Sequence, residues 1–170
     1  FLFLILEIKK KNILDIKKKL FKYRFFYLGC SFGFSFFLFG NYWISISLTH
    51  DEEFRNLIPF SLILIPLFLS LFLGIAISIV GPFAQKNIFY ILLFSLFFSL
   101  FEFLRGNLLT GFPWNLVSYT WSWSTESIQI LSVIGTYALS LISITFFCTP
   151  ILFFQTKIIK RNSIFLLILI

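Results

Sequence analysis

The chain has 170 residues, of which 59% are hydrophobic and 12% are charged, with a mean hydropathy of +0.96 and a formal net charge of +7. Soluble domains carry about a quarter charged residues, so this composition excludes a soluble globular domain and indicates an integral membrane protein. The positive charge alone identifies no partner, because an AT-rich coding sequence also enriches Lys and Asn beside Phe and Ile.

Apolar stretches near 20 residues, the length that crosses a bilayer as a helix, recur along the chain. They predict full spans at about 25–48, 60–80, 88–104 and 128–154, and partial spans at 1–8 and 164–170 that are too short to cross alone. The predicted fold class is therefore all-α, a polytopic transmembrane helical bundle with four full spans and two partial ones.

Both ends of the sequence lie inside apolar runs. The chain opens on FLFLIL, ends on IFLLILI and contains no Met. The first run lacks the charged region and the small-residue cleavage site of a signal peptide. We therefore expect residues 1–170 to be a single transmembrane domain, a fragment of a larger protein.

The linker after the first partial span is basic and amphipathic. It reads IKKKNILDIKKKLFKYR, with Ile13, Ile16 and Leu20 at helical spacing among lysines. A polybasic segment beside a membrane span is more often held by anionic lipid headgroups than by nucleic acid, so we expect membrane contact and no nucleic acid.

The basic residues also predict the orientation of the spans. If the basic linker is cytoplasmic, only Arg55 and Arg105 of the 14 Lys and Arg residues fall outside. Cytoplasmic loops carry an excess of Lys and Arg, so this threading is favoured. In this orientation, we expect the part of the protein after the partial span at 164–170 to lie on the exoplasmic side, which in a bacterium is the periplasm.

The apparent catalytic motifs lack the context that their chemistry needs. Residues 29–33 spell G-x-S-x-G, but a hydrolase elbow requires a strand, a turn and a helix, whereas this motif lies within a predicted span. Gly29 and Gly33 also form G-x-x-x-G, which suits close helix packing. Cys30 and Cys148 lie in predicted spans without an obvious base, which favours packing over catalysis.

Metal and cofactor motifs are not found either. The chain has one His and two separated Cys residues, without C-x-x-C, H-E-x-x-H or a phosphate loop. The sequence therefore predicts no catalytic residue, no metal site and no cofactor.

The most informative segment is EFLRGNLLTGFPWNLVSY, residues 102–119. Glu102 and Arg105 share a helical face near the outer end of a span, which fits either a site or an ion pair that anchors the helix end. Gly111 and Pro113 bracket Trp114, and such a turn can aim the ring toward the bundle.

Aromatic residues gather at the predicted outer face. Asn41, Tyr42 and Trp43 close the first full span, and Tyr119, Trp121 and Trp123 follow Trp114. An aromatic belt at the membrane interface explains Trp121 and Trp123. For Trp114, a belt position and a specific role both remain open.

Residues 102–114, EFLRGNLLTGFPW, closely resemble the E-x-L-R-G-x-x-x-T-G-F-P-W signature in the membrane domain of bacterial apolipoprotein N-acyltransferases. FGNYWISISL at 39–48 is similar to the family's G-x-x-W-x-x-x-S-I helix ending, and IGTYALSLI at 134–142 is similar to its G-x-Y-x-L-S-F segment. The resemblance covers nearly the whole chain from about residue 25.

The resemblance implies an enzyme of the bacterial inner membrane. Such enzymes transfer an acyl chain from a phospholipid donor to the N-terminal cysteine of a diacylglyceryl-modified lipoprotein. Their Glu, Lys and Cys triad belongs to a periplasmic nitrilase-like domain, and no residue of this chain matches it. A transporter or channel domain and a non-enzymatic membrane scaffold are the alternatives; a continuous polar pore would favour transport.

The resemblance also gives candidate roles to four residues. Glu102, Arg105, Trp114 and Trp43 become candidates for substrate or lipid binding. Arg105 would attract a phosphate or order the loop, Glu102 would hold Arg105, and Trp114 would line the lipid entrance.

Overall fold

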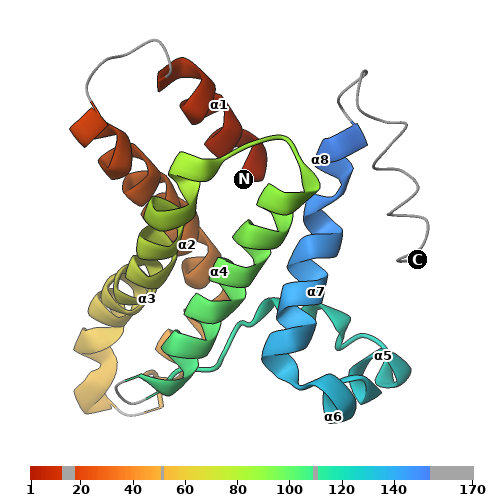
Figure 1. Cartoon of the computed structure of the whole chain (residues 1–170). Coiled ribbons are helices and arrows are strands. Elements are labelled where there is room, and N and C mark those ends of the chain that lie inside the picture. The colour runs from red at the N-terminus through yellow and green to blue at the C-terminus, as the bar shows by residue number, and fades with distance from the viewer. Residues whose placement is uncertain (13–17, 51, 109–110, 154–170) are drawn as a thin grey trace.

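The computed structural model describes residues 1–12, 18–50, 52–108 and 111–153, and these residues form helices and connecting segments without strands. The all-α prediction is confirmed for this part of the chain (Figure 1), whereas the predicted partial span at 164–170 lies outside it. The elements are α1 (Leu2–Asn12), α2 (Lys18–Ser47), η1 (Glu52–Leu57), α3 (Ile58–Val80), η2 (Gly81–Phe83), α4 (Ile88–Asn107), η3 (Val117–Trp121), α5 (Thr125–Gln129), α6 (Leu131–Ile134), α7 (Thr136–Cys148) and α8 (Pro150–Phe153).

Two helical segments of the described chain are long and apolar enough to cross a membrane. They are Glu52–Phe83, which joins η1, α3 and η2, and α4 at Ile88–Asn107. A third span results only if Thr125–Ile134 and Thr136–Leu152 count as one broken span. Most of the predicted stretch 25–48 is helical within α2, which ends at Ser47, but α2 is not among these candidate spans. The predicted count of four full spans is not confirmed.

The predicted span at 128–154 is not one continuous helix in the structure. The helix axis turns by 118° between Thr125–Ile134 and Thr136–Leu152. Gly135 lies at this break with φ 79° and ψ 164°, a backbone conformation that side chains disfavour and glycine adopts readily. Hydropathy does not detect the break, because the residues on both sides of Gly135 are apolar.

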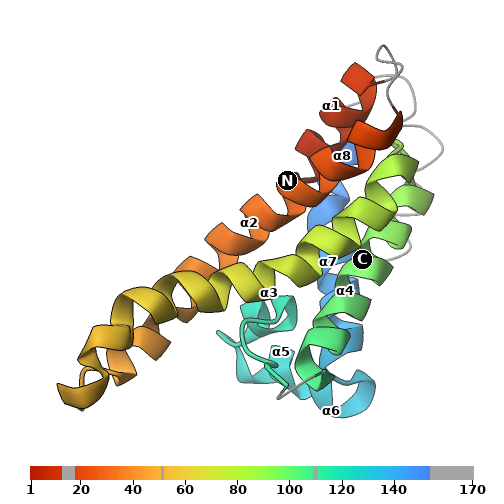
Figure 2. The same cartoon turned by 90° about the vertical axis from the view of Figure 1, so that its left-hand side faces the viewer.

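Glycines allow α2 and α3 to pack closely as an antiparallel hairpin (Figure 2). A Cβ added at Gly29 would lie 2.7 Å from the Leu73 carbonyl oxygen, and one at Gly33 would lie 3.0 Å from the Ser70 Cα. The predicted role of these glycines in helix packing is confirmed. The G-x-S-x-G sequence lies within the continuous helix α2, so it does not form a hydrolase elbow.

The hairpin is inclined to α4 and α7 and diverges from them toward its η1 end (Figure 2). Helix α4 packs against both α3 and α7. We call the two ends of the bundle the η1 end and the η2 end. Residues 111–124, which precede α5, lie between the diverging helices near the η1 end (Figure 2).

Candidate functional site

After α4, the chain turns back into the bundle as a mainly non-helical stretch. We call residues 111–121 the inserted segment. Its Leu116 and Ser118 are buried, the Val117 N–H donates to Glu102 Oε1 at 3.0 Å, and the Ser118 N–H donates to Ser140 Oγ at 3.1 Å. Glu102 and Ser140 lie about 6 to 8 Å inside the ends of α4 and α7, at 1.5 Å per residue.

The inserted segment explains why polar side chains occur within apolar helices. Non-helical backbone at membrane depth has N–H and C=O groups without helical partners, and each unsatisfied group costs several kcal/mol in hydrocarbon. Side chains from the surrounding helices supply the missing partners. The polar residues of the signature therefore stabilise an irregular backbone inside the bundle.

Arg105 holds the Phe-Pro-Trp turn from the inside. Its side chain is 3% exposed, and its Nη1 donates to the carbonyl oxygens of Phe112 at 2.9 Å and Trp114 at 2.7 Å. The guanidinium lies over the Phe37 ring, 4.8 Å from the ring centroid, in a cation–π contact. The Phe112 N–H in turn donates to the Arg105 carbonyl oxygen at 3.0 Å. One side chain thus joins α2, α4 and the inserted segment.

Glu102 binds the other part of the inserted segment through the Val117 N–H. Glu102 and Arg105 do not approach within ion-pair distance of each other in the described structure; each binds backbone groups instead. Their spacing along α4 places opposite charges on one face of the helix. The carboxylate and the guanidinium therefore balance each other's charge without a direct contact.

Two residues with positive φ shape the turn. Gly111 has φ 68°, and an added Cβ there would lie 2.8 Å from the Gly106 carbonyl oxygen. Asn115 has φ 58°, a conformation that Asn tolerates better than most residues. Asn115 Nδ2 also donates to the Phe36 carbonyl oxygen of α2 at 3.3 Å, and Gly40 leaves room for its side chain.

The structure brings together two tryptophans that are distant in sequence. The rings of Trp43 and Trp114 form an edge-to-face pair with centroids 5.5 Å apart and an interplanar angle of 69°. Trp43 is 44% exposed and Trp114 is 54% exposed, so the pair forms part of the surface at the η1 end. The four predicted site residues thus form one connected unit, because Arg105 and Glu102 hold the segment that carries Trp114.

Trp121 makes specific contacts in addition to its predicted place in an aromatic belt. Its Nε1 donates to Ser143 Oγ at 2.7 Å, and its ring stacks on Phe147 with centroids 6.2 Å apart. Trp121 therefore fixes the end of the inserted segment to α7. Trp123 is 78% exposed, and its belt position stays a prediction.

Asn115, Ser140 and Ser143 are site residues that the sequence analysis did not select. Each binds either the inserted segment or a neighbouring helix. Asn115 follows the Phe-Pro-Trp turn directly, and this position could have marked it. The serines of α7 carry no such signal, because many serines of the chain bind only carbonyls of their own helix.

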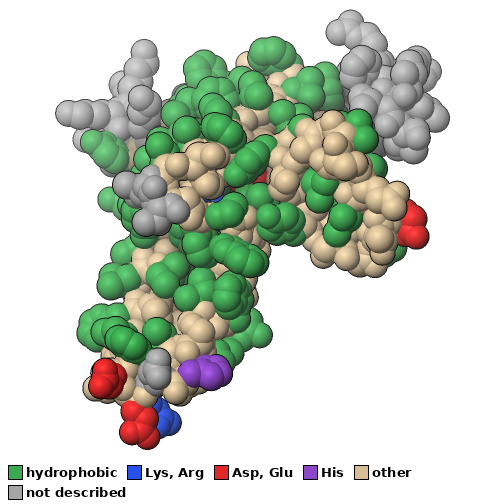
Figure 3. All heavy atoms as spheres, turned by 90° about the horizontal axis from the view of Figure 1, so that it is seen from below, with side chains coloured by type: hydrophobic (Ala, Val, Ile, Leu, Met, Phe, Trp, Pro, Cys, Tyr) green, Lys and Arg blue, Asp and Glu red, His purple; other side chains and the backbone are tan. Residues whose placement is uncertain are grey.

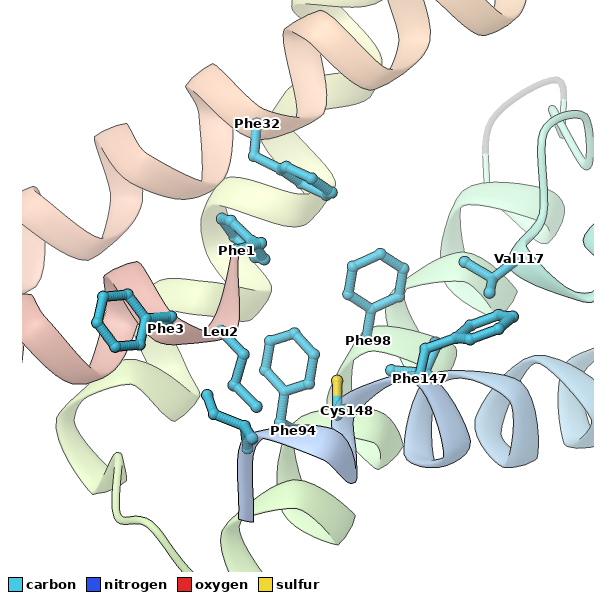
Figure 4. A pocket seen from close by; sticks show the side chains of 11 residues that line it. Phe1, Leu2, Phe3, Phe32, Phe94, Phe98, Val117, Phe147 and Cys148 are labelled. Atoms are coloured by element: carbon cyan, nitrogen blue, oxygen red, sulfur yellow. The ribbon is translucent and has the colours of Figure 1, made fainter. Parts of the chain in front are cut away.

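An apolar cavity of about 620 Å³ lies beside the tip of the inserted segment, with Val117 in its wall (Figure 4). Phe32 of α2, Phe94 and Phe98 of α4 and Phe147 of α7 surround the same space. Its lining suits hydrocarbon, because no charged side chain contributes to it. Within the described residues, no three His, Cys, Asp or Glu side chains group as a metal site.

These features define a helical membrane domain that holds a tryptophan-bearing segment between its helices with buried charged and polar side chains. This segment is non-helical up to Leu116 and continues as the short 3-10 helix η3. The chain belongs to the apolipoprotein N-acyltransferase N-terminal domain family, whose model matches residues 12–149.

Curated relatives carry the same family name. The chain is 41% identical to the apolipoprotein N-acyltransferase of Rickettsia prowazekii (strain Madrid E), over 82% of this chain and 29% of that protein. It is 40% identical to the one of Rickettsia bellii (strain RML369-C), over 82% and 28%, and 33% identical to the one of Rhodopseudomonas palustris, over 72% and 23%. The chain thus spans less than a third of the length of these relatives. No solved structure matches it significantly.

Proposed function

We propose that this chain is the membrane domain of an enzyme that transfers an acyl chain from a phospholipid to the N-terminal, diacylglyceryl-modified cysteine of an apolipoprotein. Family membership supports the acyltransferase class. The Trp43–Trp114 pair, held in place by Glu102 and Arg105, is the observation that carries the proposal for this domain.

We place the domain in a bacterial inner membrane with the basic linker in the cytoplasm and the η1 end in the periplasm. The distribution of charge supports this orientation. Arg24 and Lys86 lie toward the η2 end, whereas Glu52, Glu53 and Arg55 lie in η1. Seen from the η1 end, the surface is largely apolar or uncharged, and several charged side chains gather at the tip of the α2–α3 hairpin (Figure 3).

The role proposed for the membrane domain is positioning. Both proposed substrates are anchored in the bilayer by acyl chains, so a domain that holds these chains beside the reacting groups converts a diffusive encounter into an oriented one. The Glu, Lys and Cys triad expected for the family has no counterpart in this chain, and the bond-forming chemistry is assigned to a periplasmic nitrilase-like domain of the whole enzyme.

For Arg105, the contacts favour ordering of the inserted segment over capture of a lipid phosphate. The guanidinium is buried, it is engaged by two carbonyl oxygens and one aromatic ring, and Glu102 balances its charge. Of its buried donors, only Nη2 has no hydrogen-bond partner among the described residues, and a phosphate that reached it would bring an unbalanced negative charge into a buried site. The half-exposed rings of Trp43 and Trp114 are therefore the proposed lipid contacts.

The test is N-acylation of a lipoprotein in a bacterium whose own enzyme has been depleted. The whole gene that carries this chain would be expressed there, and mass spectrometry of the lipoprotein's N-terminal peptide would measure the added acyl chain. Trp43→Ala and Trp114→Ala should each lower the rate by up to about tenfold, because an aromatic pair contributes about 0.5–1.5 kcal/mol.

Trp123→Ala is the matched control, because Trp123 is more exposed and lies outside the Trp43–Trp114 pair. We expect it to retain the rate of the unaltered protein. Absence of N-acylation with the unaltered gene rejects the function. Equal rates in all three tryptophan variants reject only the role of the pair.

A further inference from the structure

Residues 125–134 form one short helix that leaves the direction of the bundle. Ile130, which joins α5 to α6, has φ −58° and ψ −29°, so the backbone stays helical from Thr125 to Ile134. Ten residues extend about 15 Å, whereas the hydrocarbon core of a bilayer is about 30 Å thick. The 118° turn at Gly135 directs this helix across the axis of α7 rather than along it.

This helix has an apolar and a polar face. With 3.6 residues per turn, the five apolar side chains of this helix centre on one side, where Ser127 is the one polar residue among them. Thr125, Gln129 and Ser132 lie on the opposite side, and Glu126 lies between the two sides. None of the apolar residues, which are Ile128, Ile130, Leu131, Val133 and Ile134, is fully buried, and Val133 is 83% exposed. The tertiary structure therefore leaves much of the apolar face uncovered.

We propose that Thr125–Ile134 is an interfacial helix, which lies in the plane of the membrane at the headgroup–acyl boundary on the side of the η1 end. Its apolar face would rest on lipid acyl chains, and Thr125, Gln129 and Ser132 would face water. An amphipathic helix with this geometry binds a bilayer surface through the area of its apolar face. The inference concerns the placement of the domain in the membrane and does not depend on acyl transfer.

The residues that follow the helix indicate that lipid, and not a protein, covers its apolar face. Gly135 alone separates the helix from α7, whose Ile142 and Phe146 are about half exposed, and α7 packs against the membrane-crossing helix α4. The apolar side chains of the helix thus adjoin a helix that exposes apolar side chains of its own.

The neighbouring residues also fit a membrane interface. Trp123 is 78% exposed directly before the helix, the position and residue type of an interfacial anchor. Glu126 is the only charged residue of Thr125–Ile134, and its Oε2 accepts a hydrogen bond from Ser124 Oγ at 2.6 Å. A single carboxylate offers no attraction to anionic lipids, so binding should depend on apolar contact and be insensitive to salt.

The interfacial helix follows the inserted segment of the candidate site closely in the chain. Trp121, at the end of the inserted segment, is fixed to Ser143 of α7, and only three residues separate it from Thr125. A helix held at the membrane surface would therefore lie close in sequence to the end of the inserted segment.

Depth measurements with spin labels test this inference. Ile130→Cys and Ser132→Cys lie nearly opposite each other on the helix, and each would be labelled with a nitroxide after Cys30→Ser and Cys148→Ser remove the native thiols. The protein would be reconstituted into phosphatidylcholine vesicles. Collision rates with oxygen, which concentrates in lipid, and with a nickel chelate, which stays in water, would give the depth of each label.

We expect the label at 130 to favour oxygen and the label at 132 to favour nickel, with a depth difference of up to about 10 Å, the diameter of a helix with its side chains. Equal depths would overturn the proposal. Exclusion of both reagents at 130 would also overturn it, because a protein surface would then cover the apolar face. If either variant fails to fold, Gln129→Cys and Ile134→Cys form a second pair on different faces.

Discussion

Replacement of Arg105 by methionine tests the central structural argument. Methionine keeps an unbranched, apolar side chain in α4 but removes the donor for the carbonyl oxygens of Phe112 and Trp114 and the cation over the Phe37 ring. The expected result is a substantial loss of stability, because Arg105 connects three parts of the fold.

The size of this loss in the free energy of unfolding can be estimated from the two hydrogen bonds to carbonyl oxygens. Hydrogen bonds in membrane proteins average about 0.6 kcal/mol, which gives a lower value of about 1.2 kcal/mol for two bonds. Two buried carbonyl oxygens without partners would cost up to about 6 kcal/mol, at about 1–3 kcal/mol each. Since Glu102 also loses its counter-charge, we expect the free energy of unfolding to fall by about 3 kcal/mol, well within this range.

The assay is reversible unfolding in mixed micelles with increasing sodium dodecyl sulfate, followed by tryptophan fluorescence. Arg55→Met is the matched control, because Arg55 is exposed in η1, and its effect should stay within about 0.5 kcal/mol. Arg105→Lys keeps the charge but lacks the planar fork of donors, so it should restore only part of the stability. A loss for Arg105→Met no larger than that for Arg55→Met would show that the contacts of Arg105 do not stabilise the fold.

Three further predictions use the same unfolding assay. Gly29→Ala should cost about 1–3 kcal/mol, because the added Cβ would lie 2.7 Å from a backbone oxygen of α3. Gly135→Ala, with nothing within 4 Å of the added Cβ, should also cost about 1–3 kcal/mol, but from its backbone conformation of φ 79° and ψ 164° alone; a neutral effect at either glycine would contradict its explanation. Trp121→Phe and Ser143→Ala should show a coupling energy of about 0.6–1.7 kcal/mol in a double-mutant cycle, and additive effects would mean that their hydrogen bond contributes nothing. Asn115→Ala should cost about 1–2 kcal/mol more than Asn115→Gly, since both lose the bond to Phe36 but only alanine is strained at φ 58°; equal losses would remove backbone strain from the explanation.

The sequence predicted which residues belong to the site better than it predicted their contacts. Glu102 and Arg105 were selected because charges are costly in an apolar helix, and the structure does involve both in the same segment. Their spacing suggested a mutual ion pair. In the folded chain, the unsatisfied backbone groups of the inserted segment are closer partners, and spacing along one helix carries no information about a segment that returns from outside it.

The membrane spans were also predicted in part: their apolar length was predicted from the sequence, but a break within one of them was not. Runs of apolar residues locate α3 and α4, because hydrophobic length is a property of the sequence alone. The break at Gly135 depends on one φ angle that glycine permits but does not require. The sequence could therefore predict an apolar stretch from 128 to 154, but not the 118° turn within it.

The sequence alone was enough to predict the helical membrane class, a helix-packing role for Gly29 and Gly33, and the residues of the signature. These depend on hydrophobic length, side-chain size and the cost of buried charge, all of which are local. The tertiary structure decided that Trp43 meets Trp114, that Ser140 and Ser143 receive the inserted segment, and that residues 125–134 turn away from α7. These features require backbone groups from distant parts of the chain to find partners within one low-dielectric interior, which no local pattern specifies.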